Sequence, residues 1–229
     1  MSSTRLPGKT LADIEGEPML ALLLARLAAA RSVGRIVVAT SDELVDDPVA
    51  TLTRKLGFIA SRGPRDDVLA RYLIAIDEAG GDGPIVRVTG DCPLIDAGIV
   101  DATVERFRAE PRCAYASNIE PRTFPDGLDV EVVDPGTLRA IAAEPLDPLD
   151  REHVTSAIRS RPERFAAVSL SGEPDLGSLR WTVDDADDLE FVRAVVRRLG
   201  SQRHAAGLAA ILAAVRNDPS LAGPDGLRG

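Results

Sequence analysis

The stretch Pro84-Ile-Val-Arg-Val-Thr89, followed at once by Gly90-Asp-Cys-Pro-Leu94, decides the fold class. A short apolar run that stops at a glycine and a proline predicts a buried strand ending in a turn. The run Arg35-Ile-Val-Val-Ala39 predicts a second buried strand. Helical periods separate these runs, and such alternation is typical of βα units and a largely parallel sheet. The sequence therefore predicts an α/β protein.

The rest of the chain continues this alternation. Three more runs predict strands nearer a sheet edge or in a β-rich insertion: Cys113 to Ser117, Leu128 to Val133 and Phe165 to Leu170. Helices are predicted over Met19 to Arg31, Pro48 to Leu56, Val68 to Ala79, Ile99 to Arg108, Arg151 to Ser160, Ala186 to Leu199 and Gly207 to Val215. Asp66 or Asp67 is the expected cap of the third helix. No internal repeat or linker divides the chain, so we expect one domain over residues 1–229 with a loose tail from Asn217 to Gly229.

Composition excludes several classes of function. The 229 residues include 27 Lys and Arg against 36 Asp and Glu, and the resulting net charge of −9 disfavours nucleic acids and acidic membranes as partners. Two cysteines, Cys92 and Cys113, are too few for a disulfide scaffold or a zinc site. The apolar run from Met19 to Leu24 is far too short for a membrane span, and no secretory signal precedes it. We therefore expect a soluble, cytoplasmic protein with a small-molecule substrate.

The N-terminal stretch Ser2-Ser-Thr-Arg-Leu-Pro-Gly-Lys9 is the first candidate site. Hydroxyls, an arginine and a lysine within eight residues could surround a polyphosphate, with backbone N–H groups freed by Gly8. Lys9 is also one of only two lysines, the other being Lys55. The spacing is not that of a P-loop, and an ordinary surface loop is the alternative that spacing leaves open.

Two aspartates follow predicted strands and form the second candidate. Asp91 follows the strand that ends at Val88, and Asp184 is the first residue after a short predicted strand that begins at Arg180. Ligands of open parallel sheets bind at the carboxyl ends of strands, so both carboxylates should face one cleft. Two carboxylates together with substrate phosphates are a typical Mg²⁺ site. The alternatives are a capped turn at Asp91 and helix N-terminal charge around Asp184.

Two weaker candidates lie in the middle of the chain. Asp129 and Glu131 are two residues apart on one predicted strand face, where they could accept hydrogen bonds from sugar hydroxyls or lie in solvent. His153 stands at the start of a predicted helix, where a capping or packing role is the alternative to a catalytic base.

Seven ordered segments of the chain resemble the spore coat polysaccharide biosynthesis protein F family, which is related to acylneuraminate and 3-deoxy-manno-octulosonate cytidylyltransferases. The segments are Ser-Thr-Arg-Leu-Pro-Gly-Lys (3–9), Val-Ala-Thr-Ser-Asp (38–42), Asp-Asp-Val-Leu-Ala-Arg-Tyr (66–72), Val-Arg-Val-Thr-Gly-Asp-Cys-Pro-Leu-Ile-Asp (86–96), Phe-Pro-Asp-Gly-Leu-Asp-Val-Glu-Val (124–132), Arg-Glu-His-Val-Thr (151–155) and Leu-Arg-Trp-Thr-Val-Asp (179–184). The resemblance covers nearly the whole chain. It implies a nucleotide-diphospho-sugar transferase fold, a three-layer α/β/α sandwich with a mostly parallel sheet.

The resemblance also implies a reaction. CTP and an acidic sugar of the nonulosonic type would give a CMP-sugar and pyrophosphate, with Mg²⁺ as cofactor, for surface or spore coat polysaccharide synthesis. A homodimer is common among such proteins. Two alternatives remain open: a nucleotide-sugar-dependent glycosyltransferase of the same fold, and a catalytically inactive nucleotide-binding homologue.

The resemblance assigns roles to individual residues. Ser3, Arg5, Gly8 and Lys9 would bind the triphosphate, Arg71 and Arg87 would lie near nucleotide or phosphate, Asp91 and Asp184 would hold Mg²⁺, and Asp129, Glu131 and His153 would line the sugar side. Arg5, Lys9 and Asp91 are the expected catalytic residues. Relatives also place a hydrophobic strand and a Gln-Ala-Arg-Met or similar turn ahead of the first segment. We therefore expect a sheet without its first strand, with a gap between the strands at 36–39 and 85–88.

Overall fold

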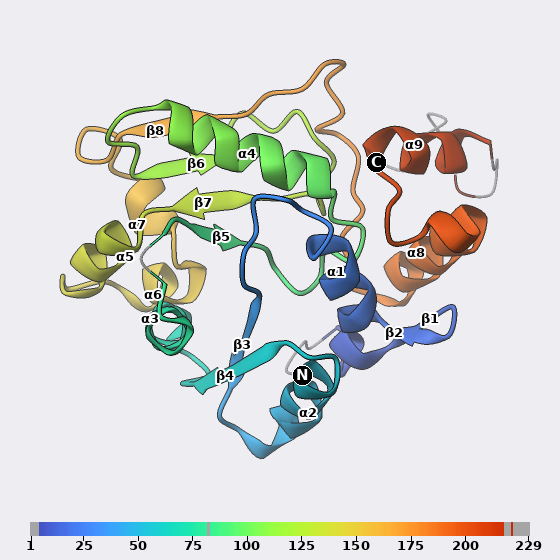
Figure 1. Ribbon diagram of the computed structural model, residues 1–229, viewed down its shortest axis with the longest axis horizontal. Coiled ribbons are helices and arrows are strands. Elements are labelled where there is room, and N and C mark those ends of the chain that lie inside the picture. The colour runs from blue at the N-terminus through green and yellow to red at the C-terminus, as the bar shows by residue number, and fades with distance from the viewer. Residues whose placement is uncertain (1–4, 82, 218–220, 222–229) are drawn as a thin grey trace.

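The computed structural model describes residues 5–81, 83–217 and 221 (Figure 1). Its largest sheet has four strands in the order β5-β7-β6-β8. The other described strands form a parallel pair, β3-β4, and a small antiparallel hairpin, β1-β2. Their bounds are β1 Asp13–Ile14, β2 Glu17–Pro18, β3 Val37–Ser41, β4 Ile59–Gly63, β5 Ile85–Arg87, β6 Tyr115–Ser117, β7 Glu131–Val133 and β8 Ala167–Ser169. β6 and β8 are parallel, whereas β7 runs antiparallel to both of its neighbours.

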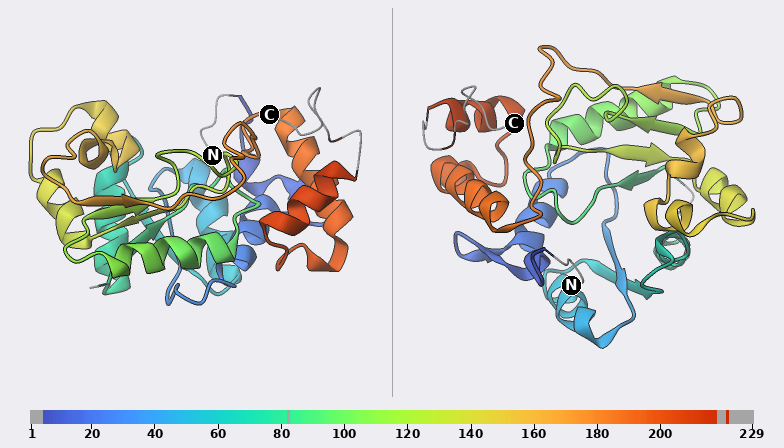
Figure 2. Two further views of the ribbon diagram at one scale, coloured as in Figure 1. Left: turned by 90° about the horizontal axis from the view of Figure 1, so that it is seen from above. Right: turned by 180° about the vertical axis from the view of Figure 1, so that it is seen from behind.

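Helices cover both faces of the four-stranded sheet. Seen from above, α4 lies on one side of the sheet and the segment from α5 to α7 lies on the other (Figure 2). The helices are η1 Lys9–Leu11, α1 Met19–Leu27, η2 Leu44–Asp46, α2 Asp47–Lys55, α3 Val68–Ala79, α4 Ala97–Ala109, α5 Pro135–Ala142, α6 Pro148–His153, α7 Ser156–Arg159, α8 Ala186–Leu199, η3 Gly200–Gln202 and α9 Leu208–Arg216. The three-layer α/β/α arrangement predicted for the chain is confirmed. None of the helices in the described residues combines the length and apolarity that crossing a bilayer requires.

Three apolar clusters hold these layers together. The largest joins α1, α4 and α8 to one face of the sheet and contains the fully buried Trp181. A second packs α3, α5 and α7 against the opposite face through Tyr115 and Val133. The third packs α1 and α2 around β3. Cys92 and Cys113 are buried and form no disulfide.

Local signals predict the two best-matched helices. The range Val68 to Ala79 expected for α3 is the range observed, and the Asp67 carboxylate caps it by accepting from Ala70 N at 2.9 Å. Gly80, at φ 62°, ends the helix in the left-handed region that glycine favours. The range expected for α8 is also correct, because a capping box of Asp185 and Asp188 defines its start.

Three expectations about local structure are wrong. The helix predicted over Arg151 to Ser160 is two short helices, α6 and α7, which are separated where buried Val154 takes φ 62°. Residues 180–184 form no strand and make one bridge, between Arg180 and Asp126. Two of the segments expected nearer an edge, Cys113 to Ser117 and Leu128 to Val133, contain the internal strands β6 and β7, and the polar residue of the second pattern, Glu131, is buried with hydrogen-bonding partners.

The expected gap in the sheet is present. In the described part of the chain β3 pairs with β4 alone and β5 pairs with β7 alone. Figure 1 shows the β3-β4 pair set apart from the four-stranded sheet. The break therefore falls between β3 and β5, the two strands predicted to flank it.

Candidate active site

Lys9 stands at the centre of the first cluster of polar side chains. Its ammonium donates to the Val183 carbonyl at 2.6 Å and to Asp184 Oδ1 at 3.1 Å, and it lies 3.7 Å from Asp91 Oδ2. The Lys9 side chain is only 15% exposed. The fold thus joins three of the residues singled out in the sequence, although Lys9 and Asp184 are 175 positions apart.

Local geometry places Asp91 beside this lysine. Thr89 Oγ1 donates to Asp91 Oδ1 at 2.5 Å, and Val183 N donates to the Asp91 carbonyl at 2.9 Å. The first contact orients the carboxylate, and the second holds the segment after β5 against the segment before α8. Asp91 and Asp184 therefore lie beside the same ammonium, as expected, although the segment that ends at Asp184 is not a strand.

Arginines surround the Asp184 carboxylate. Arg180 donates to Asp184 Oδ2 at 2.8 Å, and the exposed Arg5 lies 3.2 Å from the same oxygen. Burial acts to raise the pKa of Asp184, but hydrogen bonds from Lys9 and Arg180 outweigh it and lower the pKa below its usual value. The carboxylate is therefore ionised at neutral pH, and three cations converge on it.

Arg180 is itself fixed by the start of α8. It donates to both Asp188 oxygens, at 2.7 and 2.9 Å, in the two-pronged geometry that suits guanidinium and carboxylate groups. Burial raises the pKa of Asp188, whereas bonds from Arg180 and from the Asp184 and Asp185 N–H groups lower it, with a net lowering. Much of the acidic charge at this helix start is structural, as the alternative interpretation held, while Asp184 faces the cleft.

The N-terminal loop reaches the cluster through a turn that needs glycine. Gly8 adopts φ 75° and precedes η1, so the chain reverses at Gly8 and Lys9 enters the cleft. The expected contacts of Gly8 and Arg5 with phosphate stay predictions. Ser3, expected in the same loop, lies outside the described residues.

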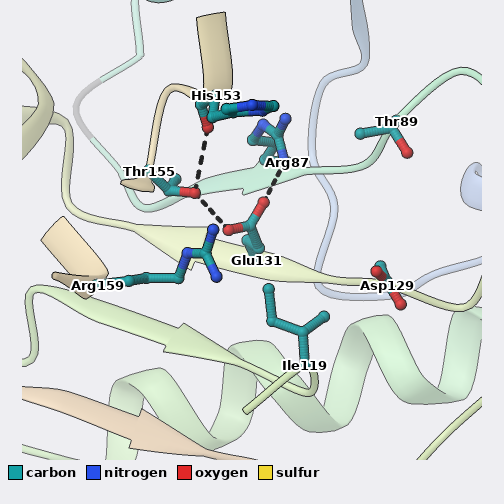
Figure 3. A pocket seen from close by; sticks show the side chains of 8 residues that line it. All are labelled: Arg87, Thr89, Ile119, Asp129, Glu131, His153, Thr155 and Arg159. Atoms are coloured by element: carbon teal, nitrogen blue, oxygen red, sulfur yellow. Dashed lines mark hydrogen bonds and ion pairs between the residues drawn. The ribbon is translucent and has the colours of Figure 1, made fainter. Parts of the chain in front are cut away.

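A second cluster surrounds Glu131 (Figure 3). The Glu131 side chain is buried, and its Oε1 accepts from the Tyr115 hydroxyl at 2.6 Å and from Thr155 Oγ1 at 2.5 Å. Arg87 donates to the other carboxylate oxygen. Burial and the adjacent Glu131 charge raise the pKa of Tyr115, which keeps that hydroxyl protonated as a donor. With both oxygens engaged, Glu131 is suited to orient Arg87 rather than to bind a sugar itself.

A pocket of about 110 Å³ opens beside this cluster. Its lining residues are Arg87, Thr89, Ile119, Asp129, Glu131, His153, Thr155 and Arg159. Arg87 and Arg159 each have a buried Nε without a hydrogen-bond partner in the described structure. Unpartnered guanidinium N–H groups beside a pocket suit an anionic ligand group. The three residues expected on the sugar side, Asp129, Glu131 and His153, all line this pocket.

Asp129 and Arg122 connect the two clusters. Arg122 donates to both Asp129 oxygens, at 2.6 and 2.8 Å, and lies 3.6 Å from Asp126. Burial is the main cause of a raised pKa at Asp126, and the Asp129 charge adds to it. Thr89, which orients Asp91, also lines the pocket beside Asp129. Thr89 therefore lies at the boundary between the two clusters.

Arg71 lies on α3, which contacts β3 and β4. Its guanidinium donates to the Pro64 and Arg65 carbonyls at 2.9 and 3.0 Å, and these bonds tie α3 to the loop after β4. The expectation that Arg71 contacts nucleotide stays a prediction. Arg87, expected near phosphate, lies beside Glu131 and the pocket.

The donor set at the first cluster suits Mg²⁺. Asp91 and Asp184 converge on the single ammonium of Lys9, so two carboxylates already share a cation there. Mg²⁺ is commonly held by one or two carboxylates with waters and substrate phosphates. No group of three or more potential metal ligands occurs among the described residues, so substrate oxygens would have to complete the coordination.

Sequence reasoning missed several residues of this cleft: Tyr115, Arg122, Thr155, Arg159 and Arg180. Thr155 and Arg180 belong to the segments 151–155 and 179–184 that carry the family resemblance, so membership of these segments could have indicated them. The other three carry no local signal, because their roles depend on partners from distant segments.

Comparison with known proteins agrees with the fold. A family described as cytidylyltransferase matches residues 1–200. The spore coat polysaccharide biosynthesis protein SpsF of Bacillus subtilis is 30% identical over 210 residues, which cover 88% of this chain and 85% of that protein. A 3-deoxy-manno-octulosonate cytidylyltransferase of Mesorhizobium japonicum is 43% identical over 112 residues, 47% of this chain and 44% of that protein.

Solved structures are similar in fold. A cytidylyltransferase from Leptospira borgpetersenii superposes with a TM-score of 0.90 at 31% identity and covers 96% of this chain and 92% of its own. A CMP:2-keto-3-deoxy-manno-octonic acid synthetase complexed with CTP has a TM-score of 0.64 at 19% identity, with coverage of 85% and 94%. The latter similarity supports the fold alone.

Proposed function

Since the chain belongs to the cytidylyltransferase family, we propose that it joins the CMP moiety of CTP to an acidic sugar and releases pyrophosphate, for polysaccharide synthesis. One observation carries the proposal: Lys9 lies between Asp91 and Asp184 after the end of β5, where a triphosphate would meet one partly buried cation and two carboxylates. The names of relatives that act on 3-deoxy-manno-octulosonate support CTP and an acidic acceptor.

The first cluster would bind the triphosphate. Lys9 is held by ion pairs with two carboxylates and by the Val183 carbonyl, so its ammonium is positioned before substrate arrives. Arg5 is exposed and close to Asp184, and it can turn toward phosphate at little cost. Fixed cations stabilise the charge that develops on the leaving pyrophosphate, because their orientation needs no rearrangement during the reaction.

The pocket beside Glu131 would bind the acceptor. Arg87 and Arg159 present guanidinium groups at its wall, and His153 is an exposed polar neighbour. A carboxylate on the sugar would pair with these arginines, whereas a neutral sugar would leave their N–H groups unpaired. The Glu131 carboxylate fixes Arg87, so the anion site is oriented in advance.

In the proposed reaction, an acceptor hydroxyl attacks the α-phosphorus in line. A new oxygen–phosphorus bond forms as the bond between the α-phosphorus and the oxygen bridging to the β-phosphate breaks, pyrophosphate leaves, and the hydroxyl proton passes to solvent. Asp91 and Asp184 would hold Mg²⁺, which when bound would neutralise charge on the phosphates. We include in the proposal a cytoplasmic location, where CTP is available, and a homodimer.

Pyrophosphate release tests the proposal. CTP, UTP, ATP and GTP are each offered with 3-deoxy-manno-octulosonate, with nonulosonic acids and with a neutral sugar 1-phosphate, in Mg²⁺ and in EDTA. We expect release with CTP, an acidic sugar and Mg²⁺. Absence of release with every combination, alongside tight CTP binding by calorimetry, would favour the inactive homologue. Transfer from a nucleotide sugar would favour the glycosyltransferase.

A pair of lysine variants sharpens the test. Lys9→Met should lower kcat by about 10²-fold or more, a typical effect of removing one preorganised electrostatic contact to a transition state. Lys55→Met is the matched control. Lys55 is exposed on α2, and its replacement removes the same charge from the chain. Equal activity of the two variants would contradict the assigned role of Lys9. Asp91→Asn should lose activity while its unfolding midpoint stays near that of the parent protein.

A further inference from the structure

The Arg180 guanidinium lies between two carboxylates. Its Nη1 donates to Asp188 Oδ1 at 2.7 Å, and its Nη2 donates both to Asp188 Oδ2 at 2.9 Å and to Asp184 Oδ2 at 2.8 Å. The Asp188 side chain is only 2% exposed. A buried carboxylate that binds a guanidinium group through two parallel hydrogen bonds fixes its plane as well as its position. Arg180 therefore approaches Asp184 from one fixed direction.

The same buried carboxylate also restrains the main chain at Asp184. Asp188 Oδ2 accepts from Asp184 N at 2.8 Å and from Asp185 N at 3.2 Å. In return, Asp185 Oδ1 accepts from Asp188 N at 2.9 Å, which completes the capping box of α8. Asp188 thus restrains Asp184 twice, at its N–H group directly and at its carboxylate through Arg180.

Other contacts hold the main chain ahead of α8. The fully buried Trp181 donates its backbone N–H to the Asp126 carbonyl at 2.6 Å, and Val183 N donates to the Asp91 carbonyl at 2.9 Å. Neither bond involves a carboxylate of α8. Loss of the two-pronged ion pair should therefore leave this main chain in place and release mainly the side chain of Asp184.

The two oxygens of Asp184 have different partners. Arg180 donates to Oδ2, and the exposed Arg5 lies 3.2 Å from the same oxygen. Lys9 donates to Oδ1 at 3.1 Å and lies 3.7 Å from Asp91 Oδ2. Asp184 thus presents Oδ1 to the ammonium that it shares with Asp91. A rotation of the Asp184 carboxylate would exchange its two oxygens, and Arg180 is the partner of Oδ2 that is itself held in place.

We propose that Arg180 and Asp188 are positioning residues that orient the Asp184 carboxylate for Mg²⁺. Asp188 fixes Arg180, and Arg180 holds Asp184 so that its Oδ1 stays on the side of Lys9 and Asp91. Partners that orient a metal ligand through its other atoms commonly change metal affinity by about 10- to 100-fold. The inference rests on the proposed function, because Mg²⁺ enters through that proposal.

Mn²⁺ binding tests the inference without turnover. Mn²⁺ prefers carboxylate and water oxygens as Mg²⁺ does, and its binding in the presence of CTP, without a sugar, is followed by the enhancement of water proton relaxation. Arg180→Lys keeps the positive charge but loses the planar fork that contacts both carboxylates. It should raise the Kd for Mn²⁺ about tenfold or more. Arg193→Lys is the matched control, because Arg193 pairs with Glu190 on the surface of α8, and its Kd should equal that of the parent protein.

A second readout separates orientation from a general loss of structure. CTP binding in EDTA, measured by calorimetry, should be the same for Arg180→Lys and the parent protein, because only the metal ligand is disturbed. The Mg²⁺ concentration that gives half of the maximal rate should rise in parallel with the Kd for Mn²⁺. At saturating Mg²⁺, kcat should return toward that of the parent protein. A variant with damaged structure would lose CTP affinity in EDTA as well.

Variants of Asp188 separate orientation from charge. In Asp188→Asn the amide oxygen can still accept from the N–H groups of Asp184 and Asp185, but the NH₂ group cannot accept from Arg180, so Mn²⁺ binding should again weaken. The double variant Arg180→Met with Asp188→Asn leaves the net charge unchanged and removes the cation beside Asp184. If Arg180 acted through charge alone, this double variant would bind Mn²⁺ more tightly, whereas a loss of orientation keeps binding weak.

The outcomes distinguish this inference from the proposed function. Equal Mn²⁺ affinity of the parent protein, Arg180→Lys and Asp188→Asn would overturn the positioning role and leave the proposed reaction standing. Tighter binding by the double variant would also overturn it. If the parent protein with CTP bound no Mn²⁺, the assignment of Asp184 to the metal would fail, and this inference would fail with it.

Discussion

Replacing Glu131 by glutamine should destabilise the protein and misplace Arg87. The carboxylate accepts from Tyr115 and Thr155 through one oxygen and from Arg87 through the other. The amide oxygen of a glutamine can keep the two hydroxyl donors, but its NH₂ group then faces the Arg87 guanidinium. One charge-assisted hydrogen bond is lost, and two donors are placed opposite each other.

The magnitude follows from burial. A hydrogen bond to a charged group contributes about 1.5–3 kcal/mol, and breaking a fully buried ion pair costs about 3–5 kcal/mol. The Glu131 side chain is 5% exposed and that of Arg87 is 17% exposed, so water can compensate Arg87 in part. We expect Glu131→Gln to lower the free energy of unfolding by about 2–3 kcal/mol.

Urea denaturation measures this change, with Glu190→Gln as the matched control. Glu190 is 66% exposed and pairs with Arg193 on the surface of α8, so its replacement should cost less than about 0.5 kcal/mol. A double-mutant cycle of Glu131→Gln with Arg87→Met should give a coupling energy above about 1 kcal/mol. Equal losses for the two glutamine variants, or a coupling near zero, would refute the argument that Glu131 holds Arg87.

Three other predictions concern stability. Arg26 is buried and donates to four backbone carbonyls, including those of Ile95 and Ala206, and burial is the main cause of a pKa lowered to about 10. Arg26→Met should therefore lower the free energy of unfolding, measured by urea denaturation, by about 3 kcal/mol or more. Arg31→Met is the control and should change it little, because Arg31 is 89% exposed. Similar losses for the two variants would contradict this prediction. The pKa of Asp188 is lowered in the folded state, so its carboxylate should stabilise the protein fully above about pH 5 and progressively less as the pH falls through the lowered pKa. Asp188→Asn should therefore flatten the pH dependence of the free energy of unfolding below about pH 5, and an unchanged slope would refute this. Gly127 has φ 110°, and a Cβ there would lie 2.7 Å from the Trp181 carbonyl carbon, whereas Gly57, at φ 85°, has open space. Gly127→Ala should thus lower the melting temperature more than Gly57→Ala, and the reverse order would show that the close approach is unimportant.

Local patterns predicted much of the architecture. The bounds of α3 and α8 are correct because apolar periodicity and capping aspartates lie within the same short segments. β4 and α5 were missed, and the latter begins with an Asp134 cap and a proline that could have indicated it. The break at Val154 could not be predicted from a local pattern, because it follows from the inward position of Thr155 against Glu131.

The sequence by itself determined the α/β class, most of the helices and the set of polar motifs, since each depends on residues that are neighbours in the chain. Only the tertiary structure decided how those motifs combine. It placed Lys9 between Asp91 and Asp184, and it made Glu131 a buried partner of Arg87 beside the pocket. The physical reason is that burial, ion pairing and pKa depend on atoms brought together from distant segments, and no local pattern contains them.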